Sequence, residues 1–421
     1  MAGSDVAERL HDVLLRLFGR EAPFRIRAWD GSEAGPADAP VVLVHSRRAL
    51  RRMLWRPDEL GLARAYVAGE VDVEGDLLSA LKRLAPFGRF IGRRPDLTAA
   101  DRRELLRTAV LLGAVGPAPK PPPEESVRPL PVGRDRAVIS HHYDVGNEFY
   151  SYVLGPSLVF SSAYFADPAL DLEAAQRAKL DLVCRKLGLT AGMRLLDVGC
   201  GWGSLLLHAA SEYGVRGVGI TVSAEQAELA RKRIAEADLA DRLEIRLADW
   251  REVDDGPYDA IASLGLTEHV GAEHLGSYAS SMFALLRGGG RLLNHQIARS
   301  GESSAPVRSF VDAYAAPEGE LVPLGTIISA LEDASFEVRD VESLREHYAR
   351  TLRAWVSNLE EHWSACASRT SPGRVRAWHL YMAASALAFE AARISVHQVL
   401  AVCPHADGRS EVPLTRRDWI L

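Results

Sequence analysis

The sequence predicts an α/β protein in which a doubly wound parallel sheet with a helical cap follows a smaller, mixed α/β N-terminal domain. Apolar segments with strand and helix spacing alternate along residues 193–295. A proline-rich stretch, residues 116–125, cannot sustain a helix or a central strand and is typical of a linker. At 421 residues the chain is also too long for one ordinary core. We therefore predict domains at 1–115 and 135–421, joined by a linker at 116–134.

The larger domain is expected to contain short apolar strands separated by amphipathic helices. The expected strands are 193–198, 217–221, 243–247, 260–264 and 291–295, and the expected helices are 204–213 and 224–237. Right-handed crossovers would place the loops that follow these strands along one edge of the sheet. From about residue 303 to 400 the pattern changes to long helices, with an apolar stripe from Leu344 to Trp363. We expect this section to cap the ligand edge.

The N-terminal domain is expected to contain a helix from Val6 to Phe18 and a strand at Val41–Val44. Two basic segments follow, 46–56 and 89–107. The first has arginines at positions 47, 48, 51, 52 and 56, interleaved with Leu50, Met53, Leu54 and Trp55. One interpretation is two solvated helix faces. The other is a patch for anionic lipid head groups, with Met53 and Trp55 entering the membrane interface.

Composition excludes several classes of protein. The net charge of −6 argues against a general nucleic-acid binder. The four cysteines are far apart and lack the spacing of metal ligands, so we expect no metal site and a reducing, cytoplasmic compartment. Charged residues interrupt the N-terminus early, and no apolar run is long enough to cross a bilayer. If the substrate is a lipid, the protein would meet the membrane from outside, as a peripheral protein at its inner face.

The strongest local signal is a glycine-rich loop between a strand and a helix. Gly199, Gly201 and Gly203 allow the backbone to turn tightly and to approach a bound nucleotide. A dinucleotide fold requires the spacing G-x-G-x-x-G and an acidic residue about 20 positions later. Here the spacing is G-x-G-x-G, and the second strand ends in Thr221. Asp197 stands before the loop, where methyltransferases place an acid, so S-adenosylmethionine is the expected cofactor.

Two further segments are expected at the cofactor. Thr221 and Gln226 would contact the ribose and the amino acid end of the cofactor, although Ser223 between them is also a candidate helix N-cap. Asp249 and Trp250 follow the third strand and would bracket the adenine with a carboxylate and an aromatic face.

Four motifs together resemble the cyclopropane-fatty-acid synthase family. They are His141–Asn147, Leu196–Gly203, Gly219–Gln226 and Glu268–Gly271. The resemblance implies a class I methyltransferase fold and methyl transfer from S-adenosylmethionine to the cis double bond of an unsaturated phospholipid acyl chain. It places cofactor binding at Tyr143, Phe160, Ser161, Asp197, Gly199, Cys200, Gly201, Trp202, Gly203, Thr221, Gln226, Asp249 and Trp250. For Cys200 the alternative is packing alone.

Within that family, further stretches are similar to the tuberculostearic acid methyltransferases of actinobacteria. They are Gly265–His269, Leu292–His295, Glu346–Trp355, Val412–Leu414 and Asp418–Trp419. This similarity implies a methylene-branched product, which a separate flavin-dependent reductase then saturates. A cyclopropane product is the alternative. We also expect a homo-oligomer, namely a dimer.

The resemblance also implies the catalytic residues. Attack of the alkene on the sulfonium methyl gives a carbocation that must lose a proton, and in the family a bicarbonate ion is thought to accept it. The family's bicarbonate ligands correspond to Glu268, His295, the backbone of Ile297, and Tyr348. A fifth ligand, usually cysteine, is replaced by Ser162, which puts bicarbonate binding in doubt.

Each catalytic candidate has a structural alternative. Glu148 is either an auxiliary base or an ordinary exposed glutamate. His295 is equally compatible with a satisfied core histidine, and Tyr348 with packing on an apolar helical stripe. Glu268 is harder to explain structurally, because a lone buried acid costs several kcal/mol. A methyltransferase for a small soluble molecule and a non-catalytic lipid-binding protein remain as competing functions.

Overall fold

The computed structural model describes residues 5–18, 23–56, 58–88, 98–125, 146–299, 310–314 and 320–420. These residues form two compact units. The first takes in the described residues of 1–128, 306–317 and 370–387, and the second those of 129–305, 318–369 and 388–421.

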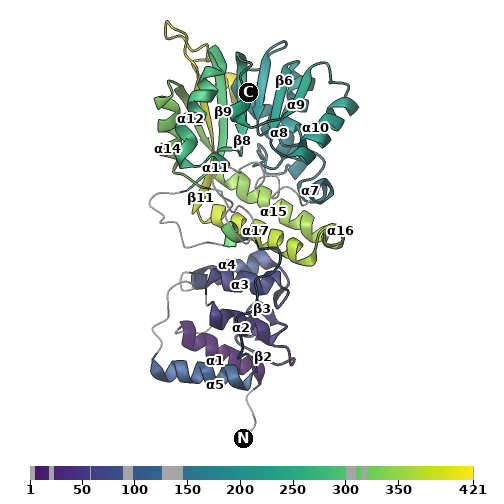
Figure 1. Ribbon diagram of the computed structural model, residues 1–421, viewed down its shortest axis with the longest axis vertical. Coiled ribbons are helices and arrows are strands. Elements are labelled where there is room, and N and C mark those ends of the chain that lie inside the picture. The colour runs from purple at the N-terminus through teal and green to yellow at the C-terminus, as the bar shows by residue number, and fades with distance from the viewer. Residues whose placement is uncertain are drawn as a thin grey trace. The chain divides into compact units, whose positions relative to one another are not determined.

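The second unit is built on one seven-stranded sheet, whose strand order is β10-β11-β9-β8-β5-β6-β7 (Figure 1). The strands are β5 (Arg194–Val198), β6 (Arg216–Thr221), β7 (Leu243–Leu247), β8 (Tyr258–Leu264), β9 (Leu286–Arg299), β10 (Glu337–Ser343) and β11 (Ile394–Val402). Five neighbouring strands, β9, β8, β5, β6 and β7, are all parallel, and β11 runs antiparallel to both β9 and β10. This arrangement confirms the predicted α/β fold.

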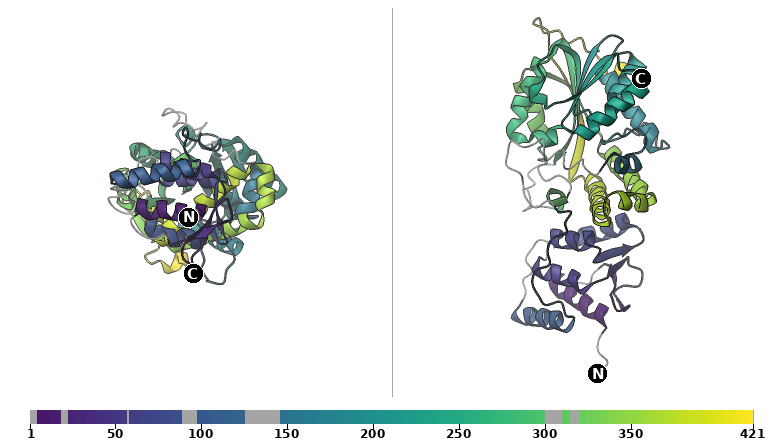
Figure 2. Two further views of the ribbon diagram at one scale, coloured as in Figure 1. Left: turned by 90° about the horizontal axis from the view of Figure 1, so that it is seen from below. Right: turned by 45° about the vertical axis from the view of Figure 1, so that its right-hand side comes forward.

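Helices cover both faces of this sheet (Figure 2). On one face lie α8 (Leu172–Leu187), α9 (Ser204–Tyr213), α10 (Ala224–Glu236) and the short α18 (Arg417–Ile420), whose buried residues share one apolar cluster. On the other face α12 (Leu275–Ala284) and α14 (Leu324–Asp333) build a second cluster. Since apolar side chains fill both faces, the loops at the carboxyl ends of the parallel strands are the part of the sheet left for a ligand.

The prediction of a purely helical cap was wrong. Residues 303–400 contain β10 and β11, which complete the sheet. Charged residues occupy much of β10 because it is an edge strand, and this hid its pattern. The predicted apolar stripe does form a helix, α15 (Arg345–Glu361), with Tyr348, Leu352, Trp355 and Leu359 buried. Trp363 instead begins the next helix, α16 (Trp363–Arg369).

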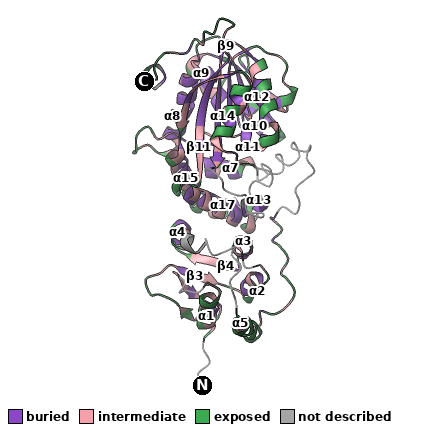
Figure 3. Ribbon diagram, turned by 90° about the vertical axis from the view of Figure 1, so that its left-hand side faces the viewer, coloured by how far each residue is buried: buried purple, intermediate pink, exposed green. Residues whose placement is uncertain are grey.

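Shorter elements of the second unit are α7 (Asn147–Leu154), the 3₁₀ helices η1 (Trp250–Glu252) and η2 (Ala272–His274), and α11 (Thr267–Val270). The short α13 (Phe310–Tyr314) and most of the long α17 (Pro372–Glu390) belong to the first unit. Figure 3 shows the burial of the sheet between its helices, in purple, and the exposure of the outer helix faces, in green. No helix in the described part of the chain is long and apolar enough to span a bilayer.

The first unit is mixed α/β, as predicted. Its four strands have the order β2-β1-β3-β4. The elements are α1 (Val6–Phe18), β1 (Arg25–Arg27), β2 (Glu33–Ala34), β3 (Val41–Val44), α2 (Arg47–Trp55), α3 (Glu59–Val67), β4 (Val71–Glu74), α4 (Leu77–Gly88) and α5 (Ala99–Leu111).

The proline-rich segment contains no helix or strand over 116–125, as expected, but this part is not a free linker. The Lys120 carbonyl accepts a hydrogen bond of 2.8 Å from the guanidinium of Arg52. Glu125 accepts two bonds of 2.6 Å from Arg64. The segment is therefore part of the first unit, and the rest of the predicted linker, 126–134, lies outside the described residues. Residues 370–387, predicted as cap, also belong to the first unit.

Candidate functional site

The glycine-rich loop has a backbone that only glycine adopts readily. It follows β5 and leads into α9, and φ is +81° at Gly199, +54° at Gly201 and +78° at Gly203. A Cβ atom added to Gly201 would meet no atom within 4 Å, so this glycine faces open space. The loop can therefore bring its peptide groups up to a ligand.

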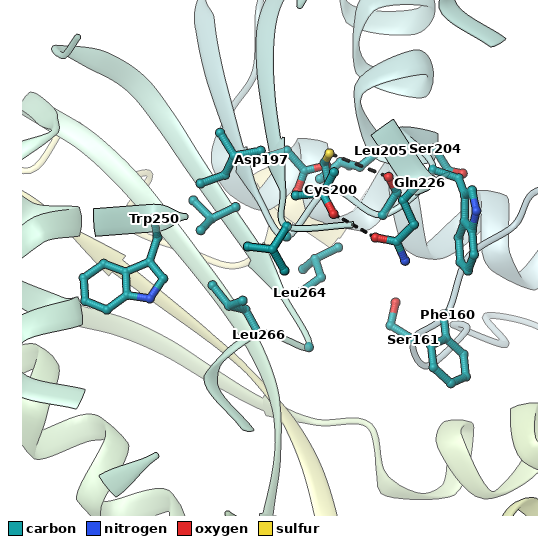
Figure 4. A pocket seen from close by; sticks show the side chains of 18 of the residues that line it. Phe160, Ser161, Asp197, Cys200, Ser204, Leu205, Gln226, Trp250, Leu264 and Leu266 are labelled. Atoms are coloured by element: carbon teal, nitrogen blue, oxygen red, sulfur yellow. Dashed lines mark hydrogen bonds between the residues drawn. The ribbon is translucent and has the colours of Figure 1, made fainter. Parts of the chain in front are cut away.

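A pocket opens beside this loop, at the carboxyl ends of the parallel strands (Figure 4). It encloses about 1100 Å³, including its mouth. The predicted cofactor residues that line it are Phe160, Ser161, Asp197, Gly199, Cys200, Gly201, Trp202, Thr221, Gln226, Asp249 and Trp250. Gly203 belongs to the loop but not to the lining, and Tyr143 lies outside the described residues. The space and the lining fit a nucleoside-sized cofactor.

Thr221 and Gln226 are held together at the second strand. The Thr221 hydroxyl donates a hydrogen bond of 2.8 Å to Oε1 of Gln226. This bond orients the amide so that its NH₂ group is the part available to a ligand oxygen. Ser223 caps α10 by accepting a bond from the Gln226 backbone N–H, so the capping interpretation is also correct.

Asp249 and Trp250 form the far wall of the pocket. Asp249 caps η1 and accepts a bond of 3.0 Å from the Arg251 backbone. Trp250 is buried and packs edge-on against Tyr278, with ring centroids 5.5 Å apart. These contacts fix the indole before any ligand binds, which lowers the entropic cost of binding.

A buried lysine at the pocket was not predicted from the sequence. Lys179 of α8 is fully buried and donates a bond of 2.9 Å to the hydroxyl of Ser161. Burial lowers the pKa of Lys179 to about 7, with Asp197 opposing the shift, and burial raises the pKa of Asp197 to about 7 against the pull of Lys179. The available signal was a lysine on the apolar face of α8, between Ala175 and Val183. His269, which also lines the pocket, was not predicted either.

Glu268 is joined to the strand that carries His295. Its Oε1 accepts a hydrogen bond of 2.7 Å from the backbone N–H of Ile297. Its Oε2 is buried without a hydrogen-bond partner in the described structure. Burial raises the pKa of Glu268 to about 7, so near neutral pH the carboxyl group exists in both protonation states. The backbone of Ile297, predicted as an anion ligand, donates its N–H to Glu268 in this structure.

His295 is buried in β9, beside the end of β8. Its Nδ1 lies 3.3 Å from Nε2 of Gln398, whereas its own Nε2 is buried without a partner among the described residues. Burial, together with the neighbouring Lys179 and Lys186, lowers the pKa of His295 well below its usual value. The histidine is therefore neutral and only half satisfied, which the alternative of a satisfied core histidine does not explain.

Tyr348 and Ser162 are buried in the same unit. Tyr348 packs against Phe389, with centroids 4.7 Å apart, and edge-on against Trp355 at 6.0 Å. Ser162 donates a bond of 3.0 Å to the Ala163 carbonyl. Packing is thus an observed role of Tyr348, and the Ser162 hydroxyl is bound to the backbone.

Glu148 does not support a role as a base. Its side chain is 63% exposed on α7 and lies 2.8 Å from the guanidinium of Arg369. The two side chains form a surface ion pair, and the Glu148 carboxylate stays in contact with water.

The thiol of Cys200, a pocket residue, does not act as a nucleophile, because burial raises its pKa well above the usual value. Among the described residues, no three His, Cys, Asp or Glu side chains are grouped to hold a metal ion.

The protein resembles characterised sequences over almost its whole length. The family model of mycolic acid cyclopropane synthetase matches residues 132–399. A probable fatty acid methyltransferase of Mycobacterium tuberculosis is 39% identical over 413 residues, 94% of each chain. A tuberculostearic acid methyltransferase of the same species is 31% identical over 414 residues, 94% of this chain and 91% of that one.

A solved structure has the same fold as the second unit. It is the mycolic acid cyclopropane synthase CmaA1, solved in complex with SAH and CTAB, which is 32% identical to this chain. The match has a TM-score of 0.61 and covers 63% of this chain and 97% of that one. The pocket described above has the glycine loop, the acids and the aromatic wall that S-adenosylmethionine requires. The chain therefore belongs to the mycolic acid cyclopropane synthetase family and is an S-adenosylmethionine-dependent methyltransferase.

Proposed function

We propose that the enzyme methylates the cis double bond of an unsaturated phospholipid acyl chain. The observation that carries this proposal is a series of aromatic rings leading from the cofactor loop to α15. The successive pairs are Trp202–Tyr150, Tyr150–Phe160, Phe160–Trp355, Trp355–Tyr348 and Tyr348–Phe389, with centroids 4.7 to 6.0 Å apart. Of these rings, Trp202 and Phe160 line the pocket, and the others are buried. Aromatic surroundings suit an acyl chain, and ring faces attract a developing carbocation. The names of the fatty acid methyltransferase relatives support the same substrate class.

S-adenosylmethionine, when bound, supplies an electrophilic methyl group. The chain must then position an alkene, exclude water and provide for removal of one proton. A protonated Glu268 and the unpaired Nε2 of His295 would both be donors toward a small oxyanion. We infer that they hold bicarbonate, which supplies the proton acceptor when bound.

The proposed product is a methylene-branched chain. The new C–C bond forms as the S–CH₃ bond breaks, and a hydride shift then moves the cation to the methylated carbon. Loss of a proton from the methyl group at that stage leaves the methylene group. Loss of a methyl proton without the hydride shift would instead close a cyclopropane. The tuberculostearic acid methyltransferase relative supports the first outcome, and a flavin-dependent reductase would then act on the product.

Expression in a host rich in monounsaturated phospholipid, with methyl-labelled methionine, should give labelled methylene-branched fatty acids by mass spectrometry and proton NMR. A difference of about 1.4 kcal/mol between the barriers to the two products already gives a tenfold product ratio. Ser162→Cys should change that ratio, because Ser162 is buried and directly follows Ser161, which lines the pocket. Glu148→Gln is the matched control and should leave the ratio unchanged. Cyclopropane as the sole product would contradict the methylene proposal but not the methyltransferase assignment.

The basic helix for which the sequence offered a lipid patch is partly tied into the first unit. Arg52 is buried and donates two bonds to Glu70, Arg51 donates to the Ala114 carbonyl, and Arg56 donates to Asp58. These arginines hold the first unit together, so α2 is not a fully solvated face. Arg47, Arg48 and Trp55 remain exposed, and the lipid patch stays a prediction.

We propose that α5 contacts the membrane. Leu106 and Val110 lie one helical turn apart on its outer face, and each is 61% exposed. Arg102 and Arg103 beside them are also exposed. Large exposed apolar side chains flanked by cations are typical of a helix that lies in an anionic lipid interface. A cytoplasmic location at the inner face of the membrane and a dimeric state are further proposals of the same kind.

Replacing Arg102 and Arg103 by Glu should weaken binding to anionic vesicles by more than about tenfold, because each basic residue contributes about 1 kcal/mol near a charged surface. Leu106→Ser with Val110→Ser should weaken vesicle binding independently of the arginines. Added salt should reduce only the contribution of the arginines. The control is Leu414→Ser with Arg409→Glu, at exposed positions in the second unit. Vesicle binding that all these changes leave intact would rule out α5 as the contact.

A further inference from the structure

His295 is connected to a buried lysine through a glutamine. Gln398 lies directly opposite His295 in the β9–β11 ladder, and both side chains are buried. Nε2 of Gln398 is 3.3 Å from Nδ1 of His295, and Oε1 of Gln398 accepts a bond of 2.8 Å from Nζ of Lys186. These three residues come from β9, β11 and α8, so the connection joins three elements distant in sequence.

The lysine determines how the glutamine amide is oriented. An ammonium group only donates hydrogen bonds, so the atom that faces Lys186 must be the amide oxygen. Burial lowers the pKa of Lys186, but the carboxylate of Glu342, 2.5 Å from Nζ, opposes this shift and favours the charged ammonium, and the Asp340 carboxylate is 3.7 Å away. The NH₂ group of Gln398 is thereby turned toward His295.

The glutamine in turn determines where His295 carries its proton. An amide NH₂ group only donates, so Nδ1 of His295 must offer its lone pair to it. A neutral imidazole has one protonated nitrogen, and that nitrogen must then be Nε2. The buried surroundings and the nearby lysines keep the ring neutral, as described above.

The protonated nitrogen has no partner in the described protein. Buried N–H groups without a partner are rare in folded proteins, so this one marks a place for a ligand atom that accepts a hydrogen bond. Glu268, whose Oε2 is also buried and unpartnered in the described structure, lies on α11, just after β8. This region is joined to β9 by the bonds from Gly265 N–H to the His295 carbonyl and from Ile297 N–H to Glu268. Two unsatisfied groups thus lie on connected neighbouring elements.

We propose that Gln398, oriented by Lys186, is a positioning residue that fixes the Nε2–H tautomer of His295. His295 then presents a hydrogen-bond donor to an anionic oxygen and has no lone pair at Nε2 with which to remove a proton. The inference rests on the proposed function for the identity of the anion, whereas the tautomer itself depends only on the three side chains. His295 therefore holds the anion, and a different group accepts the proton.

Nitrogen-15 NMR of the full-length enzyme, labelled at histidine, tests this directly. His295 should show a protonated Nε2 and an unprotonated Nδ1, and the signals are assigned by their loss in His295→Asn. Gln398→Glu replaces the amide donor with a carboxylate acceptor of the same shape, so the proton should move to Nδ1. Turnover should then fall by about 100-fold, the cost of losing one anion donor. Cofactor affinity should not change, because Gln398 does not line the cofactor pocket.

A second variant covers the case in which Gln398→Glu does not fold. Gln398→Leu removes the donor without adding a buried charge, and His295 should then populate both tautomers. A wild-type spectrum with the proton on Nδ1, or a tautomer unaffected by either substitution, would overturn the inference. A correct tautomer in an enzyme that does not methylate acyl chains would instead contradict the proposed function alone.

Discussion

Gly201→Val is expected to abolish S-adenosylmethionine binding in isothermal titration calorimetry. The wild-type glycine has φ of +54° and faces the pocket with no atom within 4 Å of an added Cβ. A β-branched side chain would both strain this backbone and occupy the space through which the cofactor approaches. We expect a loss of affinity of at least about 100-fold, equivalent to about 2.8 kcal/mol.

Gly276→Val provides the matched control. Gly276 lies exposed on α12 with no atom near an added Cβ, and its φ is not in the positive range. This variant should bind the cofactor as the wild type does. Thermal unfolding of both variants separates a local loss of binding from a loss of fold. Undiminished affinity in a folded Gly201→Val protein would refute the assignment of this loop.

Glu268→Ala is expected to lower turnover by about 100-fold or more, the cost of removing one anion donor. Glu268→Gln should retain more activity than Glu268→Ala, because an amide N–H can replace the O–H of a protonated carboxyl group. Since the pKa of Glu268 is raised to about 7, wild-type turnover should fall as pH rises through 7 and the carboxyl group loses its proton. The Gln variant should lack this step. The measurement is the pH profile of turnover on phospholipid vesicles.

The same pKa makes a prediction about stability. The folded state binds the Glu268 proton more tightly than the unfolded chain, whose carboxyl titrates near 4.5. The wild type should therefore lose stability relative to Glu268→Gln between pH 4.5 and about 7, and the difference should level off above that range.

The turnover prediction has its own contrary outcome. If the Glu268→Gln and Glu268→Ala variants are equally inactive and wild-type turnover rises with pH, Glu268 acts as an ionised base instead.

Local patterns predicted most of the residues that line the pocket beside the glycine loop. The loop around Gly201, Ser223 as a helix cap, and Asp249 with Trp250 depend on short-range geometry, in which a few neighbouring residues determine the backbone. The positions of β5 and α9 were predictable for the same reason, because strand and helix periodicities differ within a few residues.

Long-range relations were not predictable. β10 carries charges because it is an edge strand, and β11 pairs with a strand about 100 residues earlier. Lys179 and Gln398 have polar side chains that occur anywhere on a surface, and only the folded sheet shows that both are buried. Glu148 is the opposite case. Its position beside a family motif suggested a catalytic base, but in the structure it is exposed and forms a surface ion pair with Arg369.

The first unit depends on segments that are synthesised far apart in time. One of its apolar clusters joins Leu60 of α3, Phe310 of α13 and Ala377 of α17, and the Tyr66 hydroxyl lies 2.9 Å from His379. Ribosomes release a chain from its N-terminus, and domains usually fold in that order. Here the N-terminal unit cannot complete its core until residue 387 has emerged, nor can the second unit complete its sheet before β11. Both units must therefore remain incompletely folded until β11 has been synthesised, and their unpaired apolar surfaces are open to chaperones until then.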